Sequence, residues 1–324
     1  MTTRWGILGC GDIVRKRVAR AVQDDPDRRL LAVCRREVTK LEEFRHAFSV
    51  ERGYARDVDL LADPEIDAVY IATPVRLHLP QTLAAAAAGK HVLVEKPMAR
   101  TTAECDAMIA ACRAHGVRLG VAYYRRFYPL VARLKELLAV GEIGRLLSVS
   151  AVTATPLDMA PGEEGYWRVL PEESGGGALM DIGSHRIDLM LDLCGDIADV
   201  QAYCDTLTGP HAAEDCASLL FRFRSGMHGT LQCFFGTPAA VDEFTLIGTK
   251  GRLSASPLNG SQLVVDLGAT QRVETLPPPA NLHGPLIADF TAALREGRPP
   301  RVTGEAGRAV NAVMERAYRA AQRA

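Results

Sequence analysis

The first 122 residues alternate short apolar runs with amphipathic stretches, and this alternation limits what the chain can fold into. The apolar runs have the length and composition of buried strands, at residues 5–8, 30–34, 68–72, 91–94 and 118–122. Helical patterns lie between them, over residues 12–23, 77–88 and 101–115. Strands that alternate with helices form βαβ units and a parallel sheet. The third helix also has a start signal, because Thr101 precedes it and Glu104 is placed for a capping box.

After residue 123 the pattern changes to a helix over 129–140, a strand over 146–155 and a helix over 178–194. Strand-like runs separated by short glycine turns follow, at residues 217–223, 229–235, 243–248, 252–254 and 263–265. Consecutive strands joined by short turns form an antiparallel meander. The tail predicts two more helices, over 286–294 and 304–322. We therefore predict an N-terminal α/β domain over residues 1–122 and a C-terminal α+β domain over residues 123–324 with an open, mainly antiparallel sheet.

Composition excludes several classes of protein. The 38 basic and 39 acidic residues give a formal net charge of −1, so no overall attraction for nucleic acid is expected. The longest charge-poor stretch, residues 77–89, contains Pro80 and is shorter than the ~20 apolar residues of a spanning helix, so no membrane span is expected. The N-terminus has no export signal, which predicts a cytoplasmic protein. The 8 cysteines are scattered and are expected to be reduced thiols, without a disulfide framework or a structural zinc site.

A glycine-rich turn follows the first strand-like run. In a dinucleotide-binding turn, the first glycine allows a tight turn and the second lets the backbone approach a pyrophosphate at the N-terminus of the next helix. Val14 occupies the third position, which normally takes Gly or Ala. The place of this turn in a βαβ series favours a Rossmann dinucleotide site over a plain strand-to-helix turn. The residues that would hold the cofactor here are Gly9, Cys10, Gly11, Asp12 and Ile13.

The end of the second strand-like run indicates which nicotinamide cofactor is preferred. An acidic residue at this point binds the ribose 2′-hydroxyl of NAD. Here Arg35 and Arg36 follow the strand, and guanidinium groups suit the 2′-phosphate of NADP. Two solvated arginines, with Glu37 supplying a carboxylate, would favour NAD instead. We expect NADP as the preferred cofactor and NAD as the alternative.

Three further segments follow one another along the chain in an order that is specific to one family. They are A-V-Y-I-A-T-P at residues 68–74, G-K-H-V-L-V-E-K-P at 89–97 and G-G-G-A-L-M-D-I-G-S-H-R-I-D at 175–188. Together with G-I-L-G-C-G at residues 6–11, they make the chain resemble the Gfo/Idh/MocA oxidoreductases over nearly its whole length. The resemblance implies a Rossmann domain, then an open-faced sheet domain, with NAD(P) in the cleft between them. It also implies a homodimer or homotetramer formed through the C-terminal sheet.

Lys96 matches the active-site lysine of this family. An ammonium group at the carboxyl end of a strand lies where an α/β sheet presents groups to its ligand. There it can polarise a carbonyl or hydrogen-bond a reacting hydroxyl. A lysine on a loop is more often simply solvated, but its place between Glu95 and Pro97 favours the catalytic interpretation.

Asp181 and His185 match family positions beside the nicotinamide. A histidine that titrates near neutrality can donate a proton, and a carboxylate one helical turn away can orient it. Asp188 and Asp192 continue the same helix face, and we expect them to form a polar stripe in contact with solvent. No third ligand accompanies Asp181 and His185, so no metal site is expected.

The resemblance reaches several other positions. Thr73, Pro74, His78 and Glu95 are assigned by it to the cofactor site, although a histidine at a helix start can also be purely structural. Trp167 and Arg168 resemble a pair that contacts NADP in the 1,5-anhydrofructose reductase branch of the family, and residues 279–283 resemble the same branch. Tyr124 and Arg125, together with His185, are assigned to the substrate, although a buried aromatic linker would give the same pattern.

These matches predict reversible hydride transfer between NADP and a secondary hydroxyl or ketone of a sugar, cyclitol or related polyol. A dihydrodiol dehydrogenase, an imine-type reductase or an NAD-dependent glycoside-cleaving enzyme of the same fold would use similar residues. A non-catalytic NADP-binding regulatory protein is a further alternative. It would need no proton donor, so the joint presence of Lys96, Asp181 and His185 argues against it.

Overall fold

The structure is a computed structural model that describes residues 2–157, 159–163 and 165–322. The chain divides into two compact units, Met1–Tyr124 with Asn281–Ala309, and Arg125–Ala280 with Val310–Ala324. The predicted domains, 1–122 and 123–324, differ from this division mainly in the segment Asn281–Ala309. This segment belongs to the first unit because α9 (Gly284–Glu296) packs on α1 (Ala19–Gln23) and the Phe290 ring lies 5.6 Å from the Trp5 ring.

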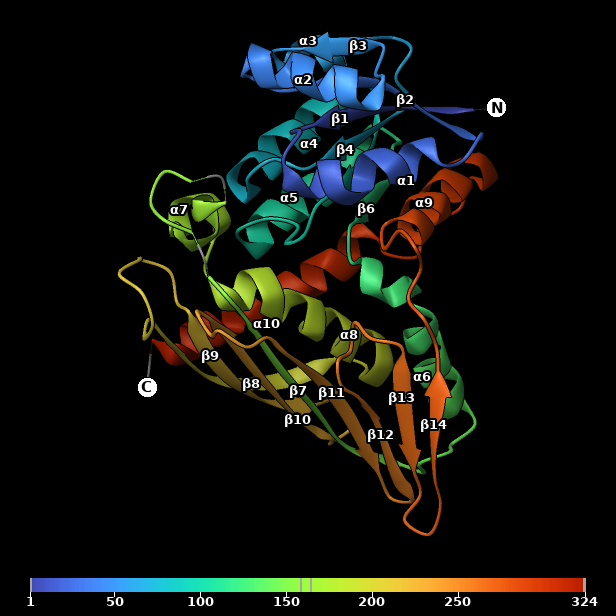
Figure 1. The fold of residues 1–324 in the computed structure, drawn as a ribbon, viewed down its shortest axis with the longest axis vertical. Coiled ribbons are helices and arrows are strands. Elements are labelled where there is room, and N and C mark those ends of the chain that lie inside the picture. The colour runs from blue at the N-terminus through green and yellow to red at the C-terminus, as the bar shows by residue number, and fades with distance from the viewer. Residues whose placement is uncertain (1, 158, 164, 323–324) are drawn as a thin grey trace. The chain divides into compact units, whose positions relative to one another are not determined.

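The first unit is built on a parallel sheet with the strand order β3-β2-β1-β4-β5-β6 (Figure 1). Its strands are β1 (Thr3–Leu8), β2 (Arg28–Cys34), β3 (Arg52–Tyr54), β4 (Ala68–Ile71), β5 (His91–Val94) and β6 (Leu119–Val121). All four residues of β4 are buried, as expected where helices cover both faces of a sheet. The strand order reverses between β1 and β4, and ligands of such sheets bind outside the carboxyl ends of the strands at this point. The prediction of a parallel βαβ sheet is confirmed.

The helical segments of the first unit include η1 (Val14–Val18), η2 (Val75–Leu77), α4 (His78–Ala87), α5 (Thr102–Ala114) and the start of α10 (Gly304–Ala321). Thr101 caps α5 as predicted, because its side-chain oxygen accepts the Glu104 N–H at 3.1 Å. The Glu104 carboxylate accepts the Arg100 N–H at 3.0 Å, so the second half of the predicted capping box goes to Arg100. No helix or strand was predicted between residues 35 and 67, where the structure has α2 (Val38–Phe48), β3 and α3 (Asp57–Leu61).

The second unit contains a sheet with the strand order β14-β13-β12-β11-β7-β10-β9-β8. Its strands are β7 (Leu146–Thr155), β8 (Ile197–Asp205), β9 (Cys216–Phe223), β10 (His228–Phe235), β11 (Val241–Gly248), β12 (Gly251–Ala255), β13 (Gln262–Asp266) and β14 (Gln271–Thr275). Neighbouring strands are antiparallel except β7 and β10, which are parallel. The prediction of an open, mainly antiparallel sheet is therefore confirmed. The two edge strands, β8 and β14, were not predicted, and no residue of β14 is buried, so it has no strand pattern.

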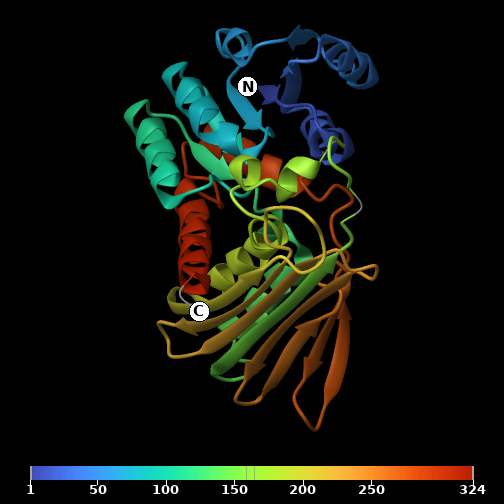
Figure 2. The ribbon, with the colours of Figure 1, turned by 90° about the vertical axis from the view of Figure 1, so that its left-hand side faces the viewer.

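Helices lie on one face of this second sheet. In Figures 1 and 2, α8 (Ser184–Cys194) runs along that face, and it continues the wide π turn η5 (Leu179–Gly183). A Cβ on Gly183 would lie 3.1 Å from Cys233 Sγ of β10, so glycine lets the helix approach the sheet closely. The strands β9 and β10 alternate buried and exposed residues, which is the pattern of a sheet with one covered face.

The remaining helical segments are η3 (Tyr124–Phe127), α6 (Pro129–Ala139), η4 (Tyr166–Val169) and α7 (Pro171–Ser174). No helix in the part of the chain that the structure describes is long and apolar enough to cross a membrane.

Candidate active site

The turn after β1 has a backbone conformation that requires glycine. Gly9 has a φ of 91°, and a Cβ on it would lie 2.7 Å from the carbonyl oxygen of Ala72, just after β4. The Gly9 N–H also donates to the carbonyl oxygen of Cys34 at 3.0 Å. The ends of β1, β2 and β4 therefore meet at this turn, which is where a dinucleotide pyrophosphate is held in such folds. The helix that follows begins with the π turn η1.

Arg35 is attached to the glycine turn. Its Nη1 donates to the carbonyl oxygen of Cys10 at 2.8 Å, and Arg36 beside it is exposed. Glu37, the carboxylate that could have favoured NAD, pairs with Lys40 at 3.0 Å. The end of β2 therefore presents guanidinium groups next to the turn.

His78 lies inside the first unit and connects two loops at the carboxyl ends of the strands. Its Nε2 lies 2.9 Å from the carbonyl oxygen of Thr73, after β4. Its Nδ1 lies 3.1 Å from that of Pro97 and 3.2 Å from that of Met98, after β5. Burial lowers the pKa of His78 although these carbonyl contacts oppose the shift. The imidazole joins the Thr73–Pro74 loop to the loop that carries Lys96.

Lys96 is the second residue after β5, and the residue between them, Glu95, is a buried carboxylate. Glu95 Oε1 accepts the Tyr70 hydroxyl at 2.7 Å, and Glu95 Oε2 accepts the Lys96 N–H at 3.1 Å. His283 Nε2 lies 3.5 Å from Oε1. Burial alone would raise the pKa of Glu95, but His283, the Tyr70 hydroxyl and the charge of Lys96 outweigh it and hold that pKa below its usual value.

Tyr124 and Arg125, assigned to the substrate by resemblance, are each largely buried in their own unit. The Tyr124 ring lies 4.4 Å from the His283 ring, and its hydroxyl accepts Arg17 Nη1 at 3.3 Å. In the second unit, Arg125 Nε donates to Asn259 Oδ1 at 2.9 Å. Both residues therefore have contacts inside their own unit, and their role at the substrate stays a prediction.

In the second unit, Asp181 lies on η5, and His185 lies in the first turn of α8 with 5% of its surface exposed. Arg168, another predicted cofactor residue, pairs with Asp181, with 3.6 Å between Arg168 Nε and Asp181 Oδ2. The same guanidinium lies 5.1 Å above the Trp167 ring. The structure therefore gathers Trp167, Arg168 and Asp181 beside the helix that carries His185.

A buried carboxylate that the sequence analysis missed holds the beginning of this helix. Glu214 accepts the N–H groups of Gly177 at 2.8 Å and Leu179 at 3.0 Å, and the Tyr318 hydroxyl at 2.8 Å. A Cβ on Gly177 would lie 1.8 Å from the carbonyl oxygen of Glu214, which explains the glycine at this position. Burial raises the pKa of Glu214 against these hydrogen bonds. The glycine run signals a close approach, but nothing in its spacing names the partner 37 residues away.

The predicted solvent stripe at Asp188 and Asp192 is wrong. Asp188 is 1% exposed, and both of its carboxylate oxygens accept hydrogen bonds from Arg126 at 2.6–3.0 Å. Asp192 pairs with Arg126 at 3.1 Å and with Lys135 at 2.7 Å. This face of α8 therefore packs against the segment η3–α6, and its charges are neutralised inside the unit.

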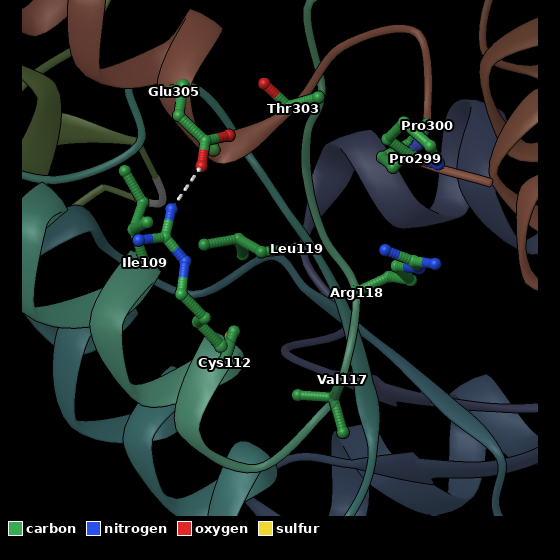
Figure 3. Close-up of a pocket in the computed structure, with 11 residues that line it drawn as sticks. Ile109, Cys112, Val117, Arg118, Leu119, Pro299, Pro300, Thr303 and Glu305 are labelled. Atoms are coloured by element: carbon green, nitrogen blue, oxygen red, sulfur yellow. Dashed lines mark hydrogen bonds and ion pairs between the residues drawn. The ribbon is translucent and has the colours of Figure 1, made fainter. Parts of the chain in front are cut away.

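A cavity of about 190 Å³ lies in the first unit, beside the amino end of the edge strand β6 (Figure 3). Pro299 and Pro300 lie on one side, and Ile109 and Cys112 of α5 on the other. Arg113 pairs with Glu305 across it at 3.4 Å. This position is far from the carboxyl ends of the strands, so the cavity is not the candidate active site. Within the described residues, no group of three or more His, Cys, Asp or Glu side chains could hold a metal.

Comparison with known families decides the classification. An oxidoreductase family model with an NAD-binding Rossmann fold matches residues 3–123, and a GFO/IDH/MocA C-terminal domain model matches residues 131–254. The chain belongs to the Gfo/Idh/MocA oxidoreductase family. The first unit is thus the nicotinamide-dinucleotide-binding fold of this family, as the glycine turn predicted.

Individual members of the family resemble the chain over most of its length. It is 34% identical over 317 residues to 1,5-anhydro-D-fructose reductase of Ensifer adhaerens, covering 94% of this chain and 92% of the relative. It is 30% identical over 281 residues to trans-1,2-dihydrobenzene-1,2-diol dehydrogenase of Mus musculus, covering 86% and 81%. The solved structure of levoglucosan dehydrogenase in complex with NADH matches with a TM-score of 0.90 at 25% identity, covering 100% of this chain and 98% of that one.

Proposed function

We propose that this protein is an NADP-preferring oxidoreductase that transfers hydride to or from the carbon of a secondary hydroxyl or ketone on a sugar, cyclitol or related polyol. Membership of an oxidoreductase family with an NAD-binding fold supports the reaction class. The similarity to 1,5-anhydro-D-fructose reductase supports a sugar-like substrate. The observation that carries the proposal is the position of Lys96, the second residue after β5, in the E-K-P segment where the family has its active-site lysine.

The residues around the glycine turn fit a phosphorylated dinucleotide. The backbone of Gly9, Cys10 and Gly11 would hold the pyrophosphate, with Asp12 and Ile13 at the start of the helix. Arg35 and Arg36 would hold the 2′-phosphate of NADP, since both follow β2 and Glu37 is paired with Lys40. The remaining cofactor contacts that we propose are Thr73, Pro74, Lys96, Trp167 and Arg168.

When bound, the nicotinamide supplies or accepts a hydride at its C4 atom. In the reducing direction, the ammonium group of Lys96 stabilises the negative charge that develops on the substrate oxygen. The imidazole of His185 donates the proton that this oxygen requires, and Asp181 orients the imidazole. We also propose Tyr124 and Arg125 as substrate residues: the Tyr124 ring lies against His283 of the first unit, and Arg125 binds Asn259 of the second.

The test is a panel of sugars, keto-sugars, inositols and dihydrodiols, each assayed with NADP and with NAD by following the absorbance of the reduced nicotinamide. The proposal expects turnover of at least one sugar-like substrate and a higher kcat/KM with the NADP couple. Turnover only with NAD would overturn the cofactor preference. Binding of NADPH without turnover of any substrate would favour a regulatory protein.

A second candidate is a dihydrodiol dehydrogenase, because the mouse dehydrogenase of this class is 30% identical to the chain. It would use the same lysine and histidine, with oxidation as the working direction. A trans-dihydrodiol that is oxidised faster than every sugar in the panel would favour this candidate.

We also propose that the protein forms a homodimer or homotetramer through the exposed face of the second sheet. Large apolar side chains on its strands are exposed, among them Tyr203 at 67%, Leu220 at 52% and Ile247 at 43%. Exposed apolar patches of this kind are typical of protein interfaces. Analytical ultracentrifugation should give a dimer or tetramer at micromolar concentration, and a monomer would contradict the proposal.

A further inference from the structure

Glu95 is a buried carboxylate whose surroundings lie entirely within the first unit. Three different elements supply its contacts: Tyr70 from β4, His283 from the segment before α9, and the backbone of Lys96 beside it. Only 8% of the Glu95 surface is exposed. A side chain so fully engaged inside the unit has little surface left for a cofactor.

Further titratable and charged groups face this carboxylate. His78 interacts with it electrostatically from α4, while its imidazole contacts the Pro97 and Met98 carbonyls of the Lys96 loop. The Tyr124 ring lies against the His283 ring at a tilt of 32°, and Arg17 donates to the Tyr124 hydroxyl. Asn281 fixes the same segment, because its side chain accepts the His283 N–H at 3.0 Å and donates to the Arg17 carbonyl oxygen at 2.9 Å.

We propose that Glu95 is a positioning residue for Lys96: its ionised carboxylate, held by Tyr70 and His283, binds the Lys96 N–H and fixes the loop that presents the lysine. This inference rests on the proposed function, in which Lys96 acts on the substrate. It also departs from the cofactor contact that the family resemblance assigns to Glu95. His283 acts one step further away, because it keeps the carboxylate ionised.

The ionised form is needed because of the number of donors around the carboxylate. Tyr70 donates to one oxygen and the Lys96 N–H to the other, with His283 beside the first. A protonated carboxyl has one oxygen turned into a donor, and it can no longer accept from every group that faces it. The Lys96 N–H or the Tyr70 hydroxyl then loses its partner, and the loop is free to shift. A displacement of about 1 Å in a reacting group can cost on the order of 100-fold in rate.

The experiment measures kcat as a function of pH for Glu95→Gln, His283→Phe and the double variant. Glu95→Gln should lower kcat by about 10- to 100-fold and change the Kd of NADPH less than about 2-fold. His283→Phe removes the contact that most strongly lowers the pKa of Glu95, so activity on the acid side should be lost at a higher pH than in the unchanged protein. In the double variant this acid-side change should disappear, because no carboxylate is left to titrate.

A matched control is Asp67→Asn. Asp67 is a carboxylate of the same unit that pairs with Arg4 at 2.8 Å. It lies just before β4, at the amino end of the parallel strands, whereas Glu95 lies at their carboxyl end. Asp67→Asn should leave the pH profile unchanged. If Glu95→Gln does not fold, the acid-side shift of His283→Phe and a smaller shift of Tyr70→Phe still test the inference.

Two results would overturn the positioning role. One is an acid-side profile that His283→Phe leaves unmoved, or moves equally in the double variant. The other is a Glu95→Gln variant that loses NADPH affinity and keeps kcat, which would make Glu95 a cofactor contact. Lys96→Ala is assayed in parallel: if it retains full turnover, the proposed function itself fails. If it is inactive and the Glu95 variants behave normally, only the positioning role fails.

Discussion

Lys96 lies in a loop at the end of a strand, whereas His185 lies in a helix, and different kinds of contact hold the two residues. In the first unit, the supporting carboxylate is Glu95, the residue next to Lys96 in sequence. In the second unit, the helix of His185 is held at its beginning by Glu214 and further along by Arg126, which binds Asp188. The first arrangement is local in sequence, and the second depends on residues 37 and 62 positions apart.

The three supporting carboxylates, Glu95, Glu214 and Asp188, also differ in the direction in which their pKa values are shifted. The pKa of Glu95 is lowered, because its polar partners outweigh burial. The pKa values of Glu214 and Asp188 are raised, because burial outweighs their partners. The ionised form of Glu95 beside Lys96 is therefore stabilised by its surroundings. The ionised forms of Glu214 and Asp188, which support the helix of His185, are destabilised by burial.

The largest expected effect comes from the helix side of this comparison. His185→Ala should lower kcat by about 10²- to 10⁴-fold while leaving the Kd of NADPH nearly unchanged, because a proton donor is removed. Steady-state kinetics and a fluorescence titration measure the two quantities. The matched control is His228→Ala, an exposed histidine at the start of β10, which should behave as the unchanged protein. If the His185→Ala variant keeps its turnover, His185 of the second unit is not the proton donor.

A second prediction concerns the cofactor side of the first unit. Arg35→Asp should lower kcat/KM for NADP by about 100-fold and change that for NAD much less, because only NADP has a 2′-phosphate to repel the new carboxylate. Arg29→Asp, on β2 but paired with Glu51 away from the turn, is the control. Equal losses with both cofactors would show that Arg35 acts through the Cys10 carbonyl alone.

A third prediction tests whether Glu214 holds the start of the helix that carries His185. Glu214→Gln should lower the free energy of unfolding by about 2–3 kcal/mol, because a Gln amide cannot accept from both Gly177 and Leu179. Tyr318→Phe, which removes one donor and keeps the carboxylate, should cost about 1 kcal/mol. Urea denaturation measures both values. Equal, small losses would mean that Glu214 does not hold the helix start.

The smallest expected effect is a pH dependence. Burial raises the pKa of Asp188 to about 6, against the attraction of Arg126. A folded-state pKa above that of the unfolded chain means that this contribution to stability is fully present below about pH 4 and is lost as the pH rises through about 6.

The stability of the unchanged protein relative to Asp188→Asn should therefore fall by about 1–2 kcal/mol between about pH 4 and about pH 7. Denaturation curves of both proteins at the two pH values measure this difference. A relative stability that rises with pH instead would mean that Arg126 lowers the pKa of Asp188.

The sequence predicted the parts of this molecule that depend on local pattern. The parallel strands, the glycine turn and the Thr101 cap follow from periodicity and from residue types that each local conformation requires. The family motifs identified Lys96 and His185 as candidates, and the family assignment is confirmed.

The remaining features depend on tertiary contacts that no local pattern carries. Asp188 and Asp192 have the spacing of an exposed stripe, and only the position of Arg126 makes their helix face buried. Glu214 binds the Gly177 backbone from 37 residues further along the chain. The sequence therefore shows that Gly177 must be small, but it does not show which residue lies against it. The edge strand β14 buries almost nothing and therefore has no apolar alternation to detect.

The most direct test of the proposed function is hydride transfer measured in Lys96→Ala, beside the unchanged protein, with the best sugar-like substrate of the panel and NADPH. We expect the unchanged protein to oxidise NADPH in a substrate-dependent way, and Lys96→Ala to bind NADPH normally but turn over about 10²- to 10⁴-fold more slowly. Equal turnover by the two proteins would contradict the proposed function.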